Sequence, residues 1–345
     1  MAAVCAAVAS VSLGSSLMAP ETTARLDGMA AAEAPPREAR FSVAPPGSSV
    51  DLPSGRECET MVERSAWEPR ADNSGSNHNM PDPQAVLASF AARPRSGFGT
   101  YDRRWDTWLL PRVNGQFTGT TDEIIQWAAC KWGLNDNMLR AILVRESTWY
   151  QQQVYPSGRC VPTWGCGDFF TTEPYQDRIV YCAELARFGR DYQDDYGLGR
   201  CPKTFSIAGV MAWSAPAWGF DWPGNQNGTF PFSRDSTAFA VDYLGSELRG
   251  CYEGWKLWLH DRPGDMWGCV GAWYSGDWRS PAARAYITNV RASMQERPWL
   301  RRDWPAIQPP CDASHGCPGV PWVADSPAGG TTSQATEPTE AGALL

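Results

Sequence analysis

The chain has 345 residues, a length that allows roughly two domains of ordinary size. Its 30 Lys and Arg against 38 Asp and Glu give a formal net charge of −8. This leaves no excess of basic charge for a phosphate backbone and argues against nucleic acid as a partner. No apolar run of about 18 residues follows the N-terminus, so the sequence predicts no membrane span in the mature chain.

Composition divides the chain into five segments. Residues 1–19 are small and apolar, and we expect them to form a secretory signal peptide. Residues 20–52 are rich in Ala, Pro, Glu and Ser and are expected to be disordered, like the tail 306–345. Residues 53–119 contain many turn residues and predict an irregular extension packed on the body. Dense hydrophobic periodicity is confined to 120–305, which we interpret as the functional domain.

Cysteine is unusually frequent, with 11 residues. Loss of Cys5 with the signal segment leaves ten, an even number that predicts disulfides in a secreted or periplasmic protein of the cell envelope. The alternative is a cytosolic protein with reduced thiols. The pairing stays open, except that Cys251 and Cys269 lie on the apolar faces of successive expected helices and should be bridged.

The first two helices of the domain have clear boundaries. Thr120 and Glu123 form a capping box that predicts a helix start, and Gly133 is placed to end that helix in a left-handed cap. Asn135 is placed to cap a second helix, whose apolar face continues onto Glu146. A carboxylate therefore shares the buried stripe at the end of this helix.

Further helices are expected downstream. One starts near Ser236 and repeats its apolar residues by threes and fours as far as Trp258. A shorter helix runs from about Asp265 to Trp273, and one possible helix lies around 177–190. Because no sustained period-two alternation occurs, the sequence predicts a mainly α fold.

Glu146 is the residue best placed for chemistry. At the C-terminal end of its helix, on the face that should be buried, both desolvation and the negative helix end disfavour ionisation. A carboxyl group that stays protonated near neutral pH can act as the general acid in glycosidic cleavage. The alternative is a surface glutamate paired with Arg145 or Arg187.

Tryptophan is also unusually frequent, with 18 residues. Flat rings that combine apolar area with a polar N–H suit the faces of sugar rings, although most tryptophans at helical spacing should be core. The expected core residues include Trp127, Trp132, Trp255 and Trp258. The candidates for a sugar cleft lie on loops: Trp149, Trp164, Trp213, Trp218 and Trp222.

Three blocks resemble a known family. TTDEIIQWAACKWGLNDNMLRAILVREST, residues 120–148, resembles the opening of the soluble lytic transglycosylase catalytic domain, in the lysozyme-like superfamily that includes goose-type lysozyme. There a helix ends in the catalytic Glu followed by Ser, which Glu146 and Ser147 match. Downstream, Ser206 with Gly209-Val210-Met211 resembles Ser followed by Gly-Leu-Met-Gln, and the run 272–276 resembles Ala-Tyr-Asn-Ala-Gly. The blocks occur in family order over 120–300.

Two departures from the family pattern affect substrate binding. Ala212 stands where the family usually has Gln, and either Trp273 or Tyr274 represents the Tyr that normally approaches the catalytic Glu. With the loop tryptophans included, the expected substrate-binding residues are Ser147, Trp149, Ser206, Gly209, Met211, Trp213, Trp218, Trp273 and Tyr274.

The resemblance implies a lysozyme-like helical domain with irregular, disulfide-linked loops and disordered termini. It implies a secreted lytic transglycosylase, active as a monomer without a cofactor, that cleaves the β-1,4 bond between N-acetylmuramic acid and N-acetylglucosamine in peptidoglycan glycan strands. Glu146 alone would act as acid and then base, giving 1,6-anhydro ends. A goose-type hydrolase would need a second carboxylate, for which Asp168 is the loop candidate, and a non-catalytic glycan-binding module is a further alternative.

Other chemistries find less support. The three histidines are sparse, no cysteine stands apart as a thiol nucleophile, and no phosphate-binding or dinucleotide motif occurs. Cys311, His315 and Cys317 offer only three metal ligands, so we expect a small disulfide loop there and no metal site.

Overall fold

The computed structural model describes residues 38–151, 176–220, 222–259 and 263–307. All the described residues belong to one compact unit. The expected signal segment, Trp164, Asp168 and the cysteines at 160, 166, 311 and 317 lie outside the described residues.

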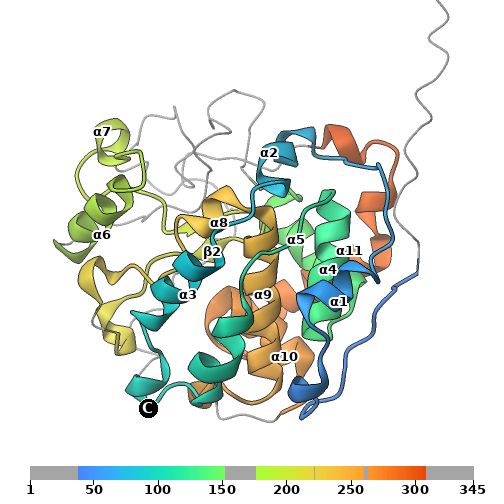
Figure 1. Ribbon diagram of the computed structural model, residues 1–345, viewed down its shortest axis with the longest axis horizontal. Helices are drawn as coiled ribbons and strands as arrows, with labels where there is room; N and C mark the ends of the chain where they lie inside the picture. Colours follow the sequence, from blue (N-terminus) through green and yellow to red (C-terminus); the bar gives the residue numbers. More distant parts are fainter. Residues whose placement is uncertain (1–37, 152–175, 221, 260–262, 308–345) are drawn as a thin grey trace, which may run out of the picture. The chain divides into compact units, whose positions relative to one another are not determined.

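The described chain is mainly helical, with one short antiparallel strand pair (Figure 1). The longer helices are α3 (Pro83–Ala91), α4 (Thr121–Trp132), α5 (Asp136–Ser147), α6 (Gln176–Ala186), α9 (Thr237–Tyr252), α10 (Met266–Ser275) and α11 (Pro281–Glu296). The shorter elements are α1 (Gly55–Glu59), α2 (Ser74–Asn77), α7 (Gln193–Tyr196), α8 (Phe232–Asp235), β1 (Thr204–Phe205) and β2 (Val210–Met211). Single-turn helices connect them, among them Ser96–Phe98, Pro216–Trp218 and Leu257–Leu259.

The boundaries of α4 and α5 confirm the sequence prediction. The Thr120 hydroxyl accepts from the Glu123 amide, and the Glu123 carboxylate accepts from the Thr120 amide at 3.0 Å. Gly133 ends α4 with a φ of 57°, where a side chain would be strained. The Asn135 side chain then caps α5 by accepting from the Met138 amide at 2.9 Å.

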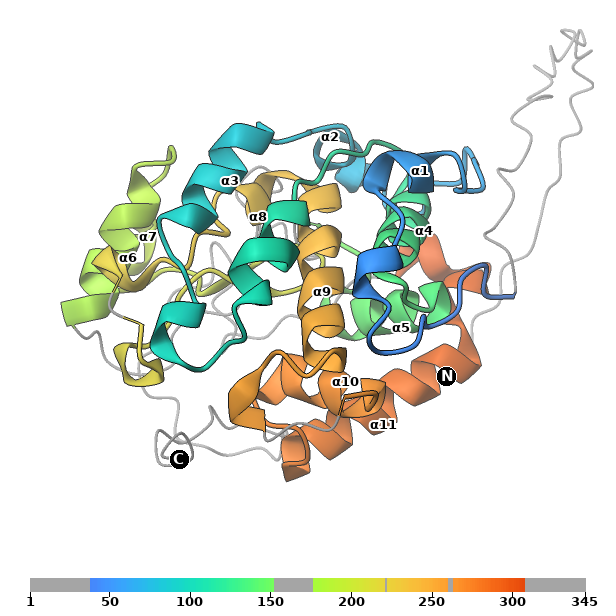
Figure 2. The same cartoon turned by 60° about the horizontal axis from the view of Figure 1, so that its bottom comes forward.

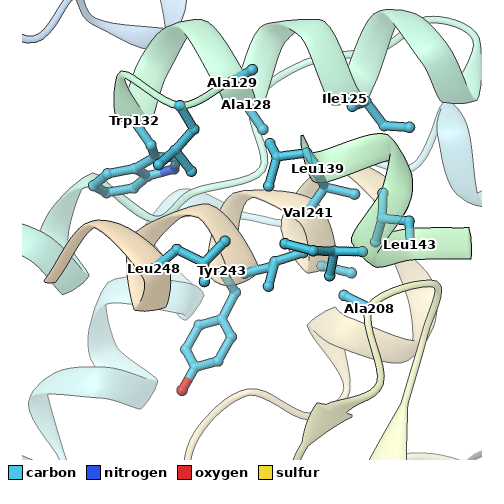
Figure 3. Packing of buried hydrophobic residues seen from close by; sticks show 14 of the residues in the cluster. Ile125, Ala128, Ala129, Trp132, Leu139, Leu143, Ala208, Val241, Tyr243 and Leu248 are labelled. Atoms are coloured by element: carbon cyan, nitrogen blue, oxygen red, sulfur yellow. The ribbon is translucent and has the colours of Figure 1, made fainter. Parts of the chain in front are cut away.

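Helix α9 lies at the centre of the main core and is buried along nearly its whole length. Figure 3 shows Leu248 of α9 near Trp132 of α4. It shows Val241 of α9 beneath Leu139 of α5, and Leu143 of α5 near Ala208. Figure 2 shows α10 and α11 beside each other, with α10 against α9 and α11 against α5. Glu146, near the end of α5, thus lies where α11 and the segment before β2 converge.

Helix α9 ends earlier than its apolar repeat indicates. The helix stops at Tyr252, and Gly254 follows with a φ of 81°. Trp255 is buried and Trp258 is half-buried, but both belong to the turn after the helix. The expectation of one helix through Trp258 is therefore wrong, because the glycine turn interrupts the backbone. Trp255 still belongs to the core, as expected, but Trp258 does not.

Helix α11 has no counterpart in the sequence prediction. Ser280 caps it, accepting from the Ala283 amide at 3.1 Å, and Pro281 occupies its first turn. Its buried face consists of Ala283, Tyr286, Ile287, Val290 and Ser293. Tyr286, Ile287 and Val290 recur at helical spacing, so the sequence did contain a signal for this helix.

Three disulfides occur among the described residues. Cys251 and Cys269 are bridged with a Cα separation of 5.7 Å, which confirms the one pairing predicted from sequence. Cys58–Cys130 ties the N-terminal extension to α4, and Cys182–Cys201 closes a segment with a small core of its own around Tyr181 and Phe205.

Part of the segment expected to be disordered is folded. The Phe41 amide donates to the Asp136 carboxylate at 3.0 Å, and the Ala44 amide donates to the Gly133 carbonyl at 3.0 Å. Leu52 is buried. The expectation for 20–52 therefore fails over 38–52, because this stretch is held largely through backbone groups that composition does not reveal. Ile307 of the expected tail also packs against the core.

In the part of the chain that the structure describes, no helix combines the length and the apolar character needed to cross a membrane.

Candidate active site

Glu146 is half-buried in the last turn of α5. The helix ends abruptly because Thr148 and Trp149 both adopt left-handed backbone conformations, with φ of 55° and 69°. Such conformations are costly for residues other than glycine and are concentrated at functional sites. The backbone therefore changes direction directly after Ser147, and Glu146 lies in the last turn before this change.

Tyr286 of α11 forms a hydrogen bond with Glu146. Its hydroxyl donates to Glu146 Oε1, and its side chain is buried. Burial, followed by the charge of Glu146 and this hydrogen bond, raises the pKa of Tyr286 well above its ordinary value of 10.0, and the Arg145 guanidinium acts in the opposite direction. Tyr286 therefore remains a neutral donor at physiological pH.

The turn between β1 and β2 closes against the other oxygen of Glu146. Gly209 has a φ of 62°, and a Cβ atom added there would lie 2.7 Å from Glu146 Oε2. Ser147 fixes the same turn, since its hydroxyl donates to the Ile207 carbonyl at 2.7 Å. Ser206, at the start of the turn, is buried with a φ of 82°. Thus Ser147, Ser206 and Gly209 are brought together beside Glu146.

Gly209→Ala should lower activity more than it lowers stability. The methyl group would meet Glu146 Oε2 and force either the carboxylate or the turn to move, and alanine would be strained at this φ. A displacement of about 1 Å at the reacting group can cost on the order of 10²-fold in rate. The melting temperature and the rate of the peptidoglycan cleavage that the motif resemblance implies should be measured on the same protein.

The matched control for that variant is Gly189→Ala. Gly189 also has a positive φ, 112°, but no atom lies within 4 Å of an added Cβ atom. Equal losses of activity in the two variants would contradict a specific role for the Gly209 turn.

The hydroxyl that donates to Glu146 Oε1 belongs to Tyr286 of α11, which the sequence analysis does not single out. Trp273 is half-buried against the main core. Tyr274 stacks on Tyr286 with ring centroids 4.5 Å apart and an interplanar angle of 4°, and it is 43% exposed. Tyr274 therefore belongs to the site through its contact with Tyr286. The sequence signal for Tyr286 was its place on the apolar stripe that follows a Ser-Pro helix start.

Trp149 does not line a groove. Its side chain is fully buried, its indole N–H donates to the Arg140 carbonyl at 2.9 Å, and its ring lies 6.0 Å from that of Trp67. The expectation that Trp149 is an exposed sugar platform is wrong, because the left-handed turn after α5 directs the ring into the core.

The other expected binding residues lie on β2 and the segment after it. Met211, Trp213 and Trp218 are half-buried, and the two indole rings lie 6.0 Å apart. Ala212 is fully buried in the smaller core around Tyr181 and Phe205. Trp222 is buried too. That Trp213 and Trp218 bind sugar remains a prediction.

Metal binding has no support in the described residues, where no cluster of three or more His, Cys, Asp or Glu side chains is arranged to hold an ion.

Comparison with known proteins finds no matching family model, no matching curated protein and no matching solved structure. A functional assignment therefore depends on the geometry around Glu146 and on the motif resemblance.

Proposed function

We propose that the chain is a secreted lytic transglycosylase that cleaves peptidoglycan glycan strands with Glu146 as its single catalytic carboxylate. The observation that carries the proposal is the pairing of Glu146 with the Tyr286 hydroxyl on one side and the Gly209 turn on the other. Tyr286 contributes a neutral hydroxyl donor to this carboxyl group, because its own pKa is raised well above the ordinary value.

In the proposed reaction, Glu146 donates its proton to the oxygen between N-acetylmuramic acid and N-acetylglucosamine as the glycosidic bond breaks. The substrate's acetamido group stabilises the positive charge that develops on the muramyl ring. Glu146, now a base, removes the proton of the muramyl 6-hydroxyl, whose oxygen closes on C1. The products are a 1,6-anhydro end and a free hydroxyl, and Glu146 regains its proton.

Substrate assistance removes the need for a second protein carboxylate, which most glycosidases use to activate water or to attack the sugar. A hydrolase outcome would require such a group, and the candidate Asp168 lies outside the described residues. The two outcomes differ in their products and are separated by product analysis.

Export to the cell envelope belongs to the same proposal. The disulfides Cys58–Cys130, Cys182–Cys201 and Cys251–Cys269 support it, because disulfides persist in oxidising compartments. A protein acting on peptidoglycan would meet its substrate there.

Tyr286→Phe should lower the cleavage rate by roughly tenfold and move the activity profile to higher pH. The hydroxyl orients Glu146, and its hydrogen bond favours the ionised carboxylate over the protonated one. Without it the acid form of Glu146 should persist to higher pH. The rate of release of soluble fragments from purified peptidoglycan, measured across pH 4 to 9 as an approximate window around the ordinary carboxyl range, checks both effects.

Tyr181→Phe is the control, because it removes a buried hydroxyl that donates to the Pro202 carbonyl at 3.0 Å in the smaller core around Tyr181 and Phe205. An unchanged pH profile in Tyr286→Phe would show that Tyr286 only packs against α5 and does not position the carboxyl group.

A further inference from the structure

The turn that closes on Glu146 has little support from its own strands. Residues 206–209 form this turn, in which the Gly209 amide donates to the Ser206 carbonyl at 3.1 Å. Strands β1 and β2 on either side of it are two residues long each. Because such a short strand pair is only marginally stable by itself, the position of Gly209 against Glu146 depends on further contacts of the turn.

Ile207, inside the turn, makes these contacts with both of its backbone groups. Its carbonyl accepts from the Ser147 hydroxyl at 2.7 Å, and its amide donates to Gln151 Oε1 at 3.2 Å. Ile207 and Gln151 are both fully buried. A buried backbone group without a partner is costly, so these two hydrogen bonds hold the turn at a fixed place relative to the end of α5.

The other end of the Gln151 side chain is fixed on α8. Its Nε2 donates to the Ser233 carbonyl at 2.7 Å and to the Arg234 carbonyl at 3.0 Å. These two bonds place the nitrogen of the side-chain amide at α8 and thereby direct its oxygen toward Ile207. The position uses one acceptor and two donors at once, a combination that an amide supplies and that neither a carboxylate nor an aliphatic side chain can supply.

The backbone of Gln151 is fixed by the N-terminal extension. Asn73 is fully buried, its Oδ1 accepts from the Gln151 amide at 2.8 Å, and its Nδ2 donates to the Trp149 carbonyl at 2.7 Å. Arg70 Nε donates to the Thr148 carbonyl at 2.9 Å. The extension therefore holds the reversed stretch of backbone that follows α5.

We propose that Gln151 is a positioning residue that sets the place of the Gly209 turn against the Glu146 carboxyl group. It acts through Ile207 and not on the substrate, and the inference rests on the proposed function for its kinetic test. Asn73, which holds Gln151, precedes the region 120–300 of motif resemblance. The N-terminal extension thus contributes to the geometry of the site.

Gln151→Met tests the proposal, because methionine has a similar length but offers neither the acceptor nor the two donors. With the turn released, kcat for peptidoglycan cleavage should fall by about ten- to hundredfold, since a misplacement of about 1 Å can cost on the order of 10²-fold. KM should change by less than about threefold, because the side chain is buried away from the substrate. Both constants should be measured well below the melting temperature of the variant.

A double variant with Gly209→Ala separates positioning from a merely structural role. If Gln151 acts through the Gly209 turn, the two substitutions disturb the same contact. The kcat of the double variant should then lie within about threefold of that of the weaker single variant. Losses that multiply would show that Gln151 acts independently of the turn and would overturn the proposal.

Gln126→Met is the matched control. Gln126 is also a buried glutamine that bonds with both ends of its amide, accepting from the Glu63 amide at 3.0 Å and donating to the Asp122 carboxylate at 2.8 Å. Neither bond involves the Gly209 turn, so this variant should lose stability while its kcat stays unchanged. Equal losses of kcat in Gln126→Met and Gln151→Met would contradict the proposal.

Gln151→Glu keeps the proposal testable if Gln151→Met does not fold. Burial favours the protonated glutamate, which still offers an acceptor for the Ile207 amide and one donor for α8. This variant should therefore keep kcat within about threefold of the parent. A loss of kcat as large as that of Gly209→Ala would show that the bond to Ile207 does not position the turn.

The ¹³C resonance of Glu146 Cδ, assigned by its absence in Glu146→Gln, separates this inference from the proposed function. It should move in Gln151→Met and stay in place in Gln126→Met. If the parent cleaves nothing but the resonance moves as expected, the proposed function fails and the positioning role stands. If the parent cleaves and Gln151→Met keeps its kcat, only the positioning role fails. A parent that does not cleave, with a resonance that does not move, contradicts both.

Discussion

Glu146→Gln should abolish cleavage of peptidoglycan while the protein stays folded. The amide keeps the shape of the side chain and can still accept from the Tyr286 hydroxyl, but it has no proton of comparable acidity for the leaving oxygen. Loss of general acid catalysis alone is expected to cost about 10²–10⁴ in rate. The melting temperature should stay unchanged or rise slightly, because a neutral group replaces a half-buried acid.

Glu184→Gln is the matched control for this variant. Glu184 is also a half-buried helical glutamate, but it pairs with Arg187 at 2.9 Å, so the substitution should leave cleavage intact. If Glu146 were instead a structural glutamate, its variant would keep full activity and lose a little stability. Activity of Glu146→Gln within a few fold of the parent would rule out the assignment.

Asp242→Asn should produce a large loss of stability, of about 3–5 kcal/mol, as expected for breaking a buried ion pair. Asp242 is fully buried and accepts from Lys131 Nζ at 2.7 Å, from the Trp132 indole at 2.7 Å, and from the amides of Asn114 and Gly115. Burial already lowers the pKa of Lys131, against the opposing effect of Asp242. Without the carboxylate, the ammonium group has no charged partner in this cluster.

Unfolding in urea measures this loss of stability, and repeating it at several pH values tests whether the charge of Lys131 causes the loss. In the variant, burial of Lys131 lowers the free energy of unfolding only while the lysine is charged. The difference in stability between variant and parent should therefore shrink as the pH rises and the lysine loses its proton. The double variant Lys131→Met with Asp242→Asn should recover part of the lost stability, because it removes the uncompensated charge. A single variant as stable as the parent would show that Asp242 does not hold this part of the core together.

The sequence predicts those parts of the fold whose signals are local. The capping residues Thr120 and Asn135 mark the starts of α4 and α5, and Gly133 supplies the left-handed cap between them. The bridge between Cys251 and Cys269 could be predicted because both residues flank one short connection. In each case a few neighbouring residues determine the geometry.

The sequence does not predict features that depend on distant contacts. The hydroxyl of Tyr286 reaches Glu146 from a helix 140 residues further along the chain. Trp149 follows Glu146 closely in sequence, yet its left-handed backbone turns it into the core. The position of a ring relative to a carboxylate is a tertiary property, so residue type and spacing could make Glu146 a candidate but could not predict its contact with Tyr286.

The most direct test of the central claim is product analysis by mass spectrometry after purified peptidoglycan is digested with the full chain. A lytic transglycosylase should give muramyl ends that are lighter than hydrolysis products by one water molecule and that carry no reducing group, and Glu146→Gln should give none. Reducing muramyl ends would contradict the single-carboxylate reaction and indicate a hydrolase, while the absence of any soluble product would contradict catalysis altogether.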